Sequence, residues 1–136
     1  MRVVLDTNIF VSALVSSGGP PDLVYRAWLV QRFDLLTCHR QVEELRETLH
    51  KPFFSGRLHP HVIGRLINDL QDMAIGIDPL PRVVRSSDPD DDFLLALAQA
   101  GRADYLVSGD KSGLLALRKH AGASIVTARA FVDRLS

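Results

Sequence analysis

Acidic side chains recur where the chain enters or leaves short apolar runs. They are Asp6, Glu43, Glu44, Asp88, Asp90, Asp91, Asp92 and Asp110. If they met at one place, two charges about 4 Å apart would repel by roughly 1 kcal/mol in water and about 4 kcal/mol at an effective dielectric of about 20. Such a cluster requires raised pKa values or a bound cation.

Oxygen ligands without histidine or cysteine among them favour Mg²⁺ or Mn²⁺ over Zn²⁺. A divalent cation held by a few carboxylates keeps positions open for water and phosphate oxygens, which is the usual arrangement for phosphodiester chemistry. The acidic series therefore predicts a metal centre that acts on phosphodiesters, provided that the fold brings the acids together.

Each acid also has an ordinary structural explanation. Capping and the helix dipole favour aspartates at a helix start, which applies to residues 88–92. Asp6 and Asp110 fit turn positions, and Glu43 and Glu44 fit a solvated helix face. The metal hypothesis therefore depends on a shared location at one edge of the fold.

The apolar pattern alternates short β-rich runs with helical stripes. Strands are predicted at residues 3–5, 35–37, 83–84, 105–107 and 125–126. Helices are predicted at residues 9–15, 22–30, 40–49, 60–74, 88–100, 114–120 and 127–135, with Asp22, Asp88 and Thr127 as caps. This alternation predicts an α/β fold, a three-layer sandwich whose central parallel sheet of about five strands is covered by helices on both faces. Ligands of such sheets gather outside the carboxyl ends of the strands, where Asp6 and Asp110 fall.

Composition excludes several classes of protein. The 136 residues fit a single domain, 1–136, and the 46% hydrophobic content excludes a disordered chain. Lys+Arg and Asp+Glu both number 16, so no overall basic field marks a nucleic-acid binder. No apolar run is long enough for a membrane span, and we expect a cytoplasmic protein. Basic residues that are scattered along the chain, some of which could line a phosphate groove, are Arg40, Arg46, Arg57, Arg65, Arg82, Arg85, Lys111 and Lys119.

Other chemistries have weaker support in the sequence. Cys38, next to a histidine, could be a nucleophile, but a free cysteine after a strand is usually a small buried apolar residue. His59 and His61 have no third nitrogen ligand at a recognisable spacing. A phosphatase with an aspartyl nucleophile would have a second aspartate two positions after Asp6, where Asn8 stands. Walker and dinucleotide-binding motifs are absent.

Four segments, in their order and spacing, resemble the PIN domain. They are Val3-Val4-Leu5-Asp6-Thr7-Asn8, Glu43-Glu44-Leu45, Asp88-Pro89-Asp90-Asp91-Asp92-Phe93-Leu94 and Ala103-Asp104-Tyr105-Leu106-Val107-Ser108-Gly109-Asp110. The resemblance covers essentially the whole chain and is strongest toward the toxins of prokaryotic toxin–antitoxin systems, relatives of VapC-type toxins. It implies a five-stranded parallel sheet and a divalent-metal-dependent ribonuclease.

The resemblance also implies residue roles. The metal-binding and catalytic residues would be Asp6, Glu44, Asp91 and Asp110, with Asn8 and Ser108 orienting ligands or water. Helix geometry alone does not separate Glu43 from Glu44, and the choice of Asp91 among three consecutive aspartates rests on the family pattern. Relatives often carry another aspartate soon after the Gly-Asp pair, where Ser112 and Gly113 stand, so a fifth carboxylate is not expected.

These implications describe an endoribonuclease that hydrolyses RNA phosphodiester bonds with Mg²⁺ or Mn²⁺. As a toxin, it would have a cognate antitoxin that covers the acidic pocket, with an arginine among the carboxylates. A homodimer is expected by analogy, with Trp28 or the helix at 63–74 as the contact face. Two alternatives stay open: a nuclease acting on DNA, and a non-catalytic module with the same fold that binds RNA or a protein partner.

Overall fold

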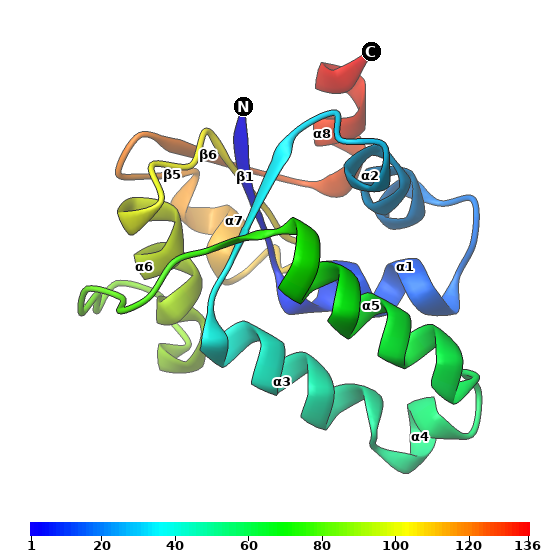
Figure 1. The fold of residues 1–136 in the computed structure, drawn as a ribbon. Coiled ribbons are helices and arrows are strands. Elements are labelled where there is room, and N and C mark those ends of the chain that lie inside the picture. The colour runs from blue at the N-terminus through cyan, green and yellow to red at the C-terminus, as the bar shows by residue number, and fades with distance from the viewer.

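A computed structural model describes all residues from Met1 to Ser136. One six-stranded sheet with the order β3-β2-β1-β4-β6-β5 runs through the centre (Figure 1). The strands are β1 (Arg2–Leu5), β2 (Asp34–Thr37), β3 (Ile75–Gly76), β4 (Tyr105–Val107), β5 (Lys119–His120) and β6 (Ala123–Val126). All neighbouring strands are parallel except the β5–β6 pair at one edge. The parallel sheet is confirmed, with five parallel strands as predicted in number and a short antiparallel strand added at the edge.

Helices lie on both faces of this sheet (Figure 1). They are α1 (Thr7–Val15), α2 (Pro20–Leu29), α3 (His39–Leu49), α4 (Pro52–Ser55), α5 (Pro60–Met73), the 3-10 turn η1 (Pro89–Asp91), α6 (Asp92–Ala100), α7 (Leu114–Leu117) and α8 (Ala128–Leu135). The helix pattern is as predicted, apart from the short α4 and an earlier end of α7. That end comes at Arg118, whose φ of 63° is incompatible with a right-handed helix.

Strand alternation divides the interior into two cores. Val3 and Leu5 belong to a core that includes α1, α2, α3, α5 and α8, whereas Val4 belongs to the core beneath α6 and α7. Successive strand side chains point to opposite faces, so a strand covered on both faces must be apolar throughout. This explains why the buried run Val3-Val4-Leu5 is uninterrupted and why the next polar residue, Asp6, stands where the strand ends.

Two sequence predictions about these elements are wrong. The third strand is Ile75–Gly76 rather than Val83-Val84. Prolines at positions 79 and 81 precede that valine pair, and Val84 is 79% exposed in a segment without regular structure. Asp22 does not cap α2, because the helix already begins at Pro20; its carboxylate instead accepts the N–H of Gly18 at 2.8 Å.

Trp28 is fully buried in the larger core, where its ring contacts Tyr25 with a centroid separation of 5.9 Å. It is therefore unavailable as a dimer face, and that prediction is wrong. The helix predicted at residues 22–30 is confirmed, but the aromatic ring of Trp28 on that helix points inward. None of the helices combines the length and the apolar character that crossing a bilayer requires.

Candidate metal centre

Asp6, Ser108 and Asp110 lie together where β1 and β4 end. The N–H of Asp6 continues the β1–β4 pairing by donating to the Val107 carbonyl at 2.8 Å. The Ser108 hydroxyl donates to Asp6 Oδ2 at 2.9 Å, and Ser108 Oγ accepts the N–H of Asp110 at 3.1 Å. Asp6 stands at the start of α1 but makes no side-chain capping bond. The nearby N–H groups of Thr7 and Asn8 lower the pKa of this carboxylate, but a turn or cap does not by itself account for its hydrogen bond to Ser108.

Gly113 allows the Asp110 carboxylate to turn back on its own loop. Asp110 Oδ1 accepts the Gly113 N–H at 3.1 Å and the Ser112 hydroxyl at 3.4 Å. A Cβ atom on Gly113 would lie 2.1 Å from Asp110 Oδ2, which no real contact tolerates. Ser112 and Gly113 stand where relatives often have another aspartate, and here they hold Asp110 in place.

The structure separates the two adjacent glutamates on α3. Glu44 is half-buried beside Thr7, and its pKa is sensitive to the charge on Asp6. Glu43 is exposed and forms a 3.8 Å ion pair with Arg46 on the same helix. The solvated-face explanation therefore fits Glu43, whereas Glu44 faces the carboxyl edge of the sheet.

A buried hydrogen-bond relay, which the sequence did not reveal, joins α3 to that edge. Gln41 is fully buried; its Nε2 donates to the Leu5 carbonyl at 2.6 Å, and its Oε1 accepts the Thr37 hydroxyl at 2.8 Å. It thus ties the ends of β1 and β2 to the helix that carries Glu44. The available signal was a polar residue four positions before Leu45, on the apolar face of α3.

The aspartates before α6 make different hydrogen bonds. Asp88 caps the 3-10 turn by accepting the N–H of Asp90 at 3.0 Å. Asp92 is buried and accepts the N–H groups of Arg85 and Ser86, at 3.1 and 2.7 Å. Asp91 makes no capping bond although it stands at the start of α6. The capping explanation holds for Asp88 and leaves Asp91 free.

Three of these carboxyls have raised pKa values, with burial as the largest cause in each. The pKa of Asp91 rises to about 6, and the charges of Asp6, Asp88, Asp110 and Glu44 add to the effect of burial. The pKa of Asp6 is raised by burial and by Asp110, against the lowering effect of the Ser108 hydrogen bond. The pKa of Glu44 is raised by burial and by Asp6, and the neighbouring Thr7 opposes that rise. Carboxyls from four separate segments therefore share one electrostatic environment.

The oxygen donors suit a hard cation, but they do not form a complete coordination site. No three carboxylate, histidine or cysteine side chains stand close enough together to hold a metal ion. The Thr7 hydroxyl, despite its closeness to Glu44, is buried without a hydrogen-bond partner of regular geometry. All the groups that face one another are oxygen donors, which Mg²⁺ and Mn²⁺ prefer. A cation would fit this edge by drawing the mutually repelling carboxylates inward.

An acidic hollow of about 510 Å³ opens beside these groups, between α3 and the turn before α6. It is lined by Arg40, Glu43, Glu44, Glu47, Asp88, Asp90 and Asp91. Asn8, predicted to orient ligands or water, is exposed just beyond Asp6. The hollow exposes Glu44 and Asp91 to solvent, while Asp6 lies deeper, at 6% exposure.

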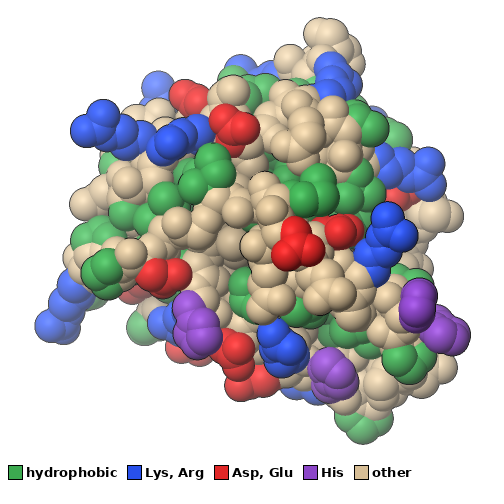
Figure 2. Space-filling view, in the orientation of Figure 1, with side chains coloured by type: hydrophobic (Ala, Val, Ile, Leu, Met, Phe, Trp, Pro, Cys, Tyr) green, Lys and Arg blue, Asp and Glu red, His purple; other side chains and the backbone are tan.

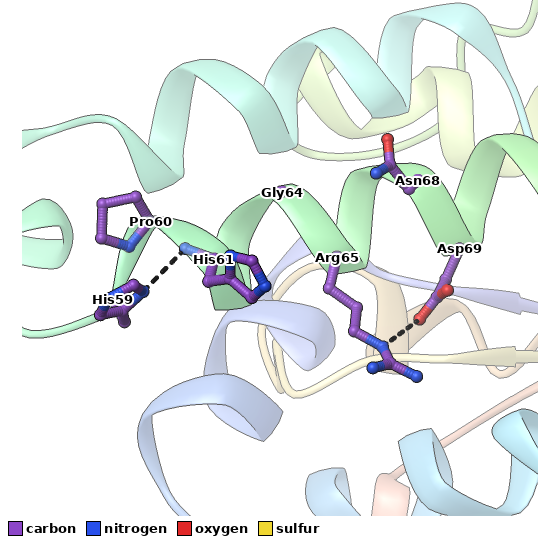
Figure 3. A pocket seen from close by; sticks show the side chains of 7 residues that line it. All are labelled: His59, Pro60, His61, Gly64, Arg65, Asn68 and Asp69. Atoms are coloured by element: carbon purple, nitrogen blue, oxygen red, sulfur yellow. Dashed lines mark hydrogen bonds and ion pairs between the residues drawn. The ribbon is translucent and has the colours of Figure 1, made fainter.

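The largest surface hollow lies elsewhere, along α5 (Figure 3), with a volume of about 550 Å³. His59 and His61 stand at one end of it and an Arg65–Asp69 ion pair of 3.8 Å at the other. His59 Nδ1 accepts the N–H of His61 at 3.0 Å and so serves as a helix cap. This hollow contains a single carboxylate, and its size does not indicate the site of chemistry.

Cys38 does not act as a nucleophile in this arrangement. Its thiol lies in the smaller core at 2% exposure, and burial raises its pKa, which disfavours the reactive thiolate. This agrees with its interpretation as a small buried apolar residue.

Comparison with known proteins identifies the family. The family model described as PIN domain matches residues 2–112. No curated protein matches the sequence. The crystal structure of FitAcB from Neisseria gonorrhoeae has a similar fold, with a TM-score of 0.52 and 16% identity over 93% of this chain and 98% of that one. The match to the family extends from β1 through the loop that holds Asp110, and the chain belongs to the PIN domain family.

Proposed function

We propose that this protein is a divalent-metal-dependent endoribonuclease whose metal ligands are Asp6, Glu44, Asp91 and Asp110. One arrangement carries the proposal: Ser108 joins Asp6 and Asp110 at the ends of β1 and β4, and Glu44 and Asp91 line the hollow beside them, so that carboxylates from four separate parts of the chain repel one another. A fold gains no stability from such repulsion. The arrangement is understandable if a cation, Mg²⁺ or Mn²⁺, offsets it.

A cation bound there would lower the pKa of an attacking water and offset negative charge on the phosphodiester. The protein's own groups set the positions of the ligands. Ser108 fixes the Asp6 carboxylate by its hydrogen bond, the 110–113 loop fixes Asp110, and the capped turn at Asp88 presents Asp91. Asn8, exposed beside Asp6, is placed to orient water or a phosphate oxygen.

Membership of the PIN domain family supports a nuclease, and the resemblance of the acidic segments to toxin relatives supports RNA as its substrate. On the same resemblance, a cognate antitoxin would cover the acidic hollow with a basic side chain, and the protein would act in the cytoplasm. A homodimer would use the face of α5, since Trp28 is buried.

Incubation of purified protein with mixed RNA, in Mn²⁺ and in EDTA, tests the proposal. We expect internal cleavage in Mn²⁺, none in EDTA, and none by Asp6→Asn in either condition, while its circular dichroism spectrum stays native. A parallel DNA substrate separates the two kinds of nuclease. Undiminished cleavage in EDTA would exclude the metal mechanism, and RNA binding without cleavage would favour the non-catalytic module.

A further inference from the structure

A second hollow, of about 370 Å³, adjoins the acidic one. Arg40 lines both, and both border the turn that presents Asp91: Pro89 and Asp92 face the second hollow. Its other walls are the irregular segment 80–84 and the start of α6 at Phe93. A strand that lay across Asp91 would therefore enter this groove directly.

The outer wall of the groove is held firmly although it has no regular structure. Asp92 accepts two backbone N–H groups from the segment, at Arg85 and Ser86. The Arg85 guanidinium donates to the Lys119 carbonyl at 2.6 Å and contacts His120 Nδ1 at 2.8 Å, which ties the segment to β5. Leu80 and Val83 pack against the smaller core. The groove is therefore formed before any ligand arrives, so binding does not require the wall to be ordered.

The groove adds a second cation, Arg82, to the Arg40 that it shares with the acidic hollow. The Arg82 side chain is exposed and makes no ion pair or hydrogen bond. Arg40 lies over the Phe93 ring, 4.6 Å from its centroid, and is held loosely by Asp90, with its Nη2 at 3.5 Å from the carbonyl and 3.9 Å from the carboxylate. Asp92 is the single acid in the lining, and the backbone N–H groups occupy it.

The groove also presents apolar surface to solvent. Val84 is 79% exposed, beside Pro81 and Leu80. On the face seen in Figure 2, Lys and Arg side chains lie at several separate places among acidic and apolar groups. Two guanidinium groups beside an apolar surface match a single-stranded nucleic acid, which offers phosphates and unstacked bases together.

We propose that this groove binds the part of a single-stranded RNA next to the phosphodiester that is cleaved. Arg82 and Arg40 contact backbone phosphates, and Val84 contacts a base. The inference rests on the proposed ribonuclease function, and it assigns substrate binding to a segment outside the acidic series. It also explains how a chain with no net charge and an acidic centre retains a polyanion: cations on one side of the Asp91 turn offset repulsion from the carboxylates.

Fluorescence anisotropy with a labelled single-stranded RNA tests the groove. The measurement uses Asp91→Asn protein in Mn²⁺, so that RNA is bound without being cleaved, and compares Arg82→Gln with Arg102→Gln in that background. Arg102 is a matched control, because it is exposed and unpaired at the opposite end of β4. We expect Arg82→Gln to weaken binding and to reduce the slope of log K against log salt by about 0.7, the value of one phosphate contact on a single strand. Val84→Ser should weaken binding with the slope unchanged.

Equal affinities and equal salt slopes for Arg82→Gln and Arg102→Gln would overturn the proposal that the groove binds RNA. Cleavage assays on the otherwise wild-type protein separate this failure from that of the proposed function. If wild-type protein cleaves RNA in Mn²⁺ and Arg82→Gln cleaves with an unchanged KM, the groove alone is wrong. If wild-type protein does not cleave RNA at all, the ribonuclease assignment is wrong, and the proposal that the groove is a substrate site is wrong as well.

Discussion

Ser108 donates a 2.9 Å hydrogen bond to the Asp6 carboxylate, although the two residues are 102 positions apart in the sequence. The parallel pairing of β1 with β4 places them side by side, because Leu5 pairs with Val107. The bond favours the charged form of Asp6, whereas burial and Asp110 favour the neutral form. Asp6 is thus oriented by Ser108 and still repelled by its acidic neighbour, a combination that a bound cation would resolve.

Glu44→Gln should abolish most RNA cleavage, whereas Glu43→Gln on the same helix should leave it near the wild-type rate. Glu44 is half-buried toward Asp6, and Glu43 is exposed and paired with Arg46. Initial rates on one RNA substrate in Mn²⁺ provide the comparison. Equal losses in both variants would show that the charge of the hollow matters rather than a particular ligand.

Gly113→Ala should lower kcat/KM on RNA by about 100-fold, the scale expected when a reacting group is displaced by about 1 Å. The new Cβ atom would lie 2.1 Å from Asp110 Oδ2, so the carboxylate must move. Gly109→Ala is the control, because a Cβ at that position has no atom within 4 Å. If Gly113→Ala cleaves as fast as Gly109→Ala, the position of Asp110 is not important for activity.

Gln41→Ala should lower the free energy of unfolding by about 1–3 kcal/mol, because it removes hydrogen-bond partners from the buried Leu5 carbonyl and the Thr37 hydroxyl. Gln71→Ala, at an exposed position of α5, should change it by no more than about 0.5 kcal/mol. Urea unfolding of both variants measures the difference. A Gln41→Ala protein as stable as Gln71→Ala would show that the relay contributes nothing to the fold.

Metal-free protein should lose stability as pH rises through the pKa of Asp91. Burial and the surrounding carboxylates raise that pKa from 3.8 to about 6. The folded state therefore holds the proton more tightly than the unfolded chain. The resulting stabilisation is full below about pH 4 and is lost as pH rises through about 6.

Asp91→Asn removes this dependence and the repulsion with it. We expect the variant to be the more stable protein near neutral pH without metal, with the difference shrinking toward pH 4. Urea titrations in EDTA across this range measure both curves. Two parallel curves would contradict the coupling of Asp91 to its acidic neighbours.

Much of the fold follows from the sequence, because a strand that is buried on both faces has an uninterrupted run of apolar residues. Uninterrupted apolar runs at Val3–Leu5 and Tyr105–Val107 indicate strands covered on both faces, and Asp6 marks the end of the first strand. The error at Val83-Val84 has a physical origin: β-branched residues favour strands locally, but prolines and the anchoring of this segment by Asp92 keep it outside the sheet.

The candidate site was only partly predictable. The sequence pattern predicted that Asp6 and Asp110 follow strand ends but did not separate Glu44 from Glu43, since that choice depends on which side of α3 faces α1 and the end of β1. The close approach of the Asp110 carboxylate to Gly113 and the hydrogen bonds of Gln41 depend on the folded chain, and no local sequence pattern predicts them. The role proposed for the exposed Val84 likewise depends on Arg40 and Phe93, which lie beside it in space.

The most direct test of the central claim is calorimetric titration of the protein with Mn²⁺, since the claim is that distant carboxylates share one cation. Wild-type protein should bind Mn²⁺, and Asp6→Asn and Asp91→Asn should each lose most of that binding while remaining folded. Glu43→Gln should titrate like wild type. The account is contradicted if wild-type protein takes up no Mn²⁺, or if both aspartate variants bind it as tightly as wild type does.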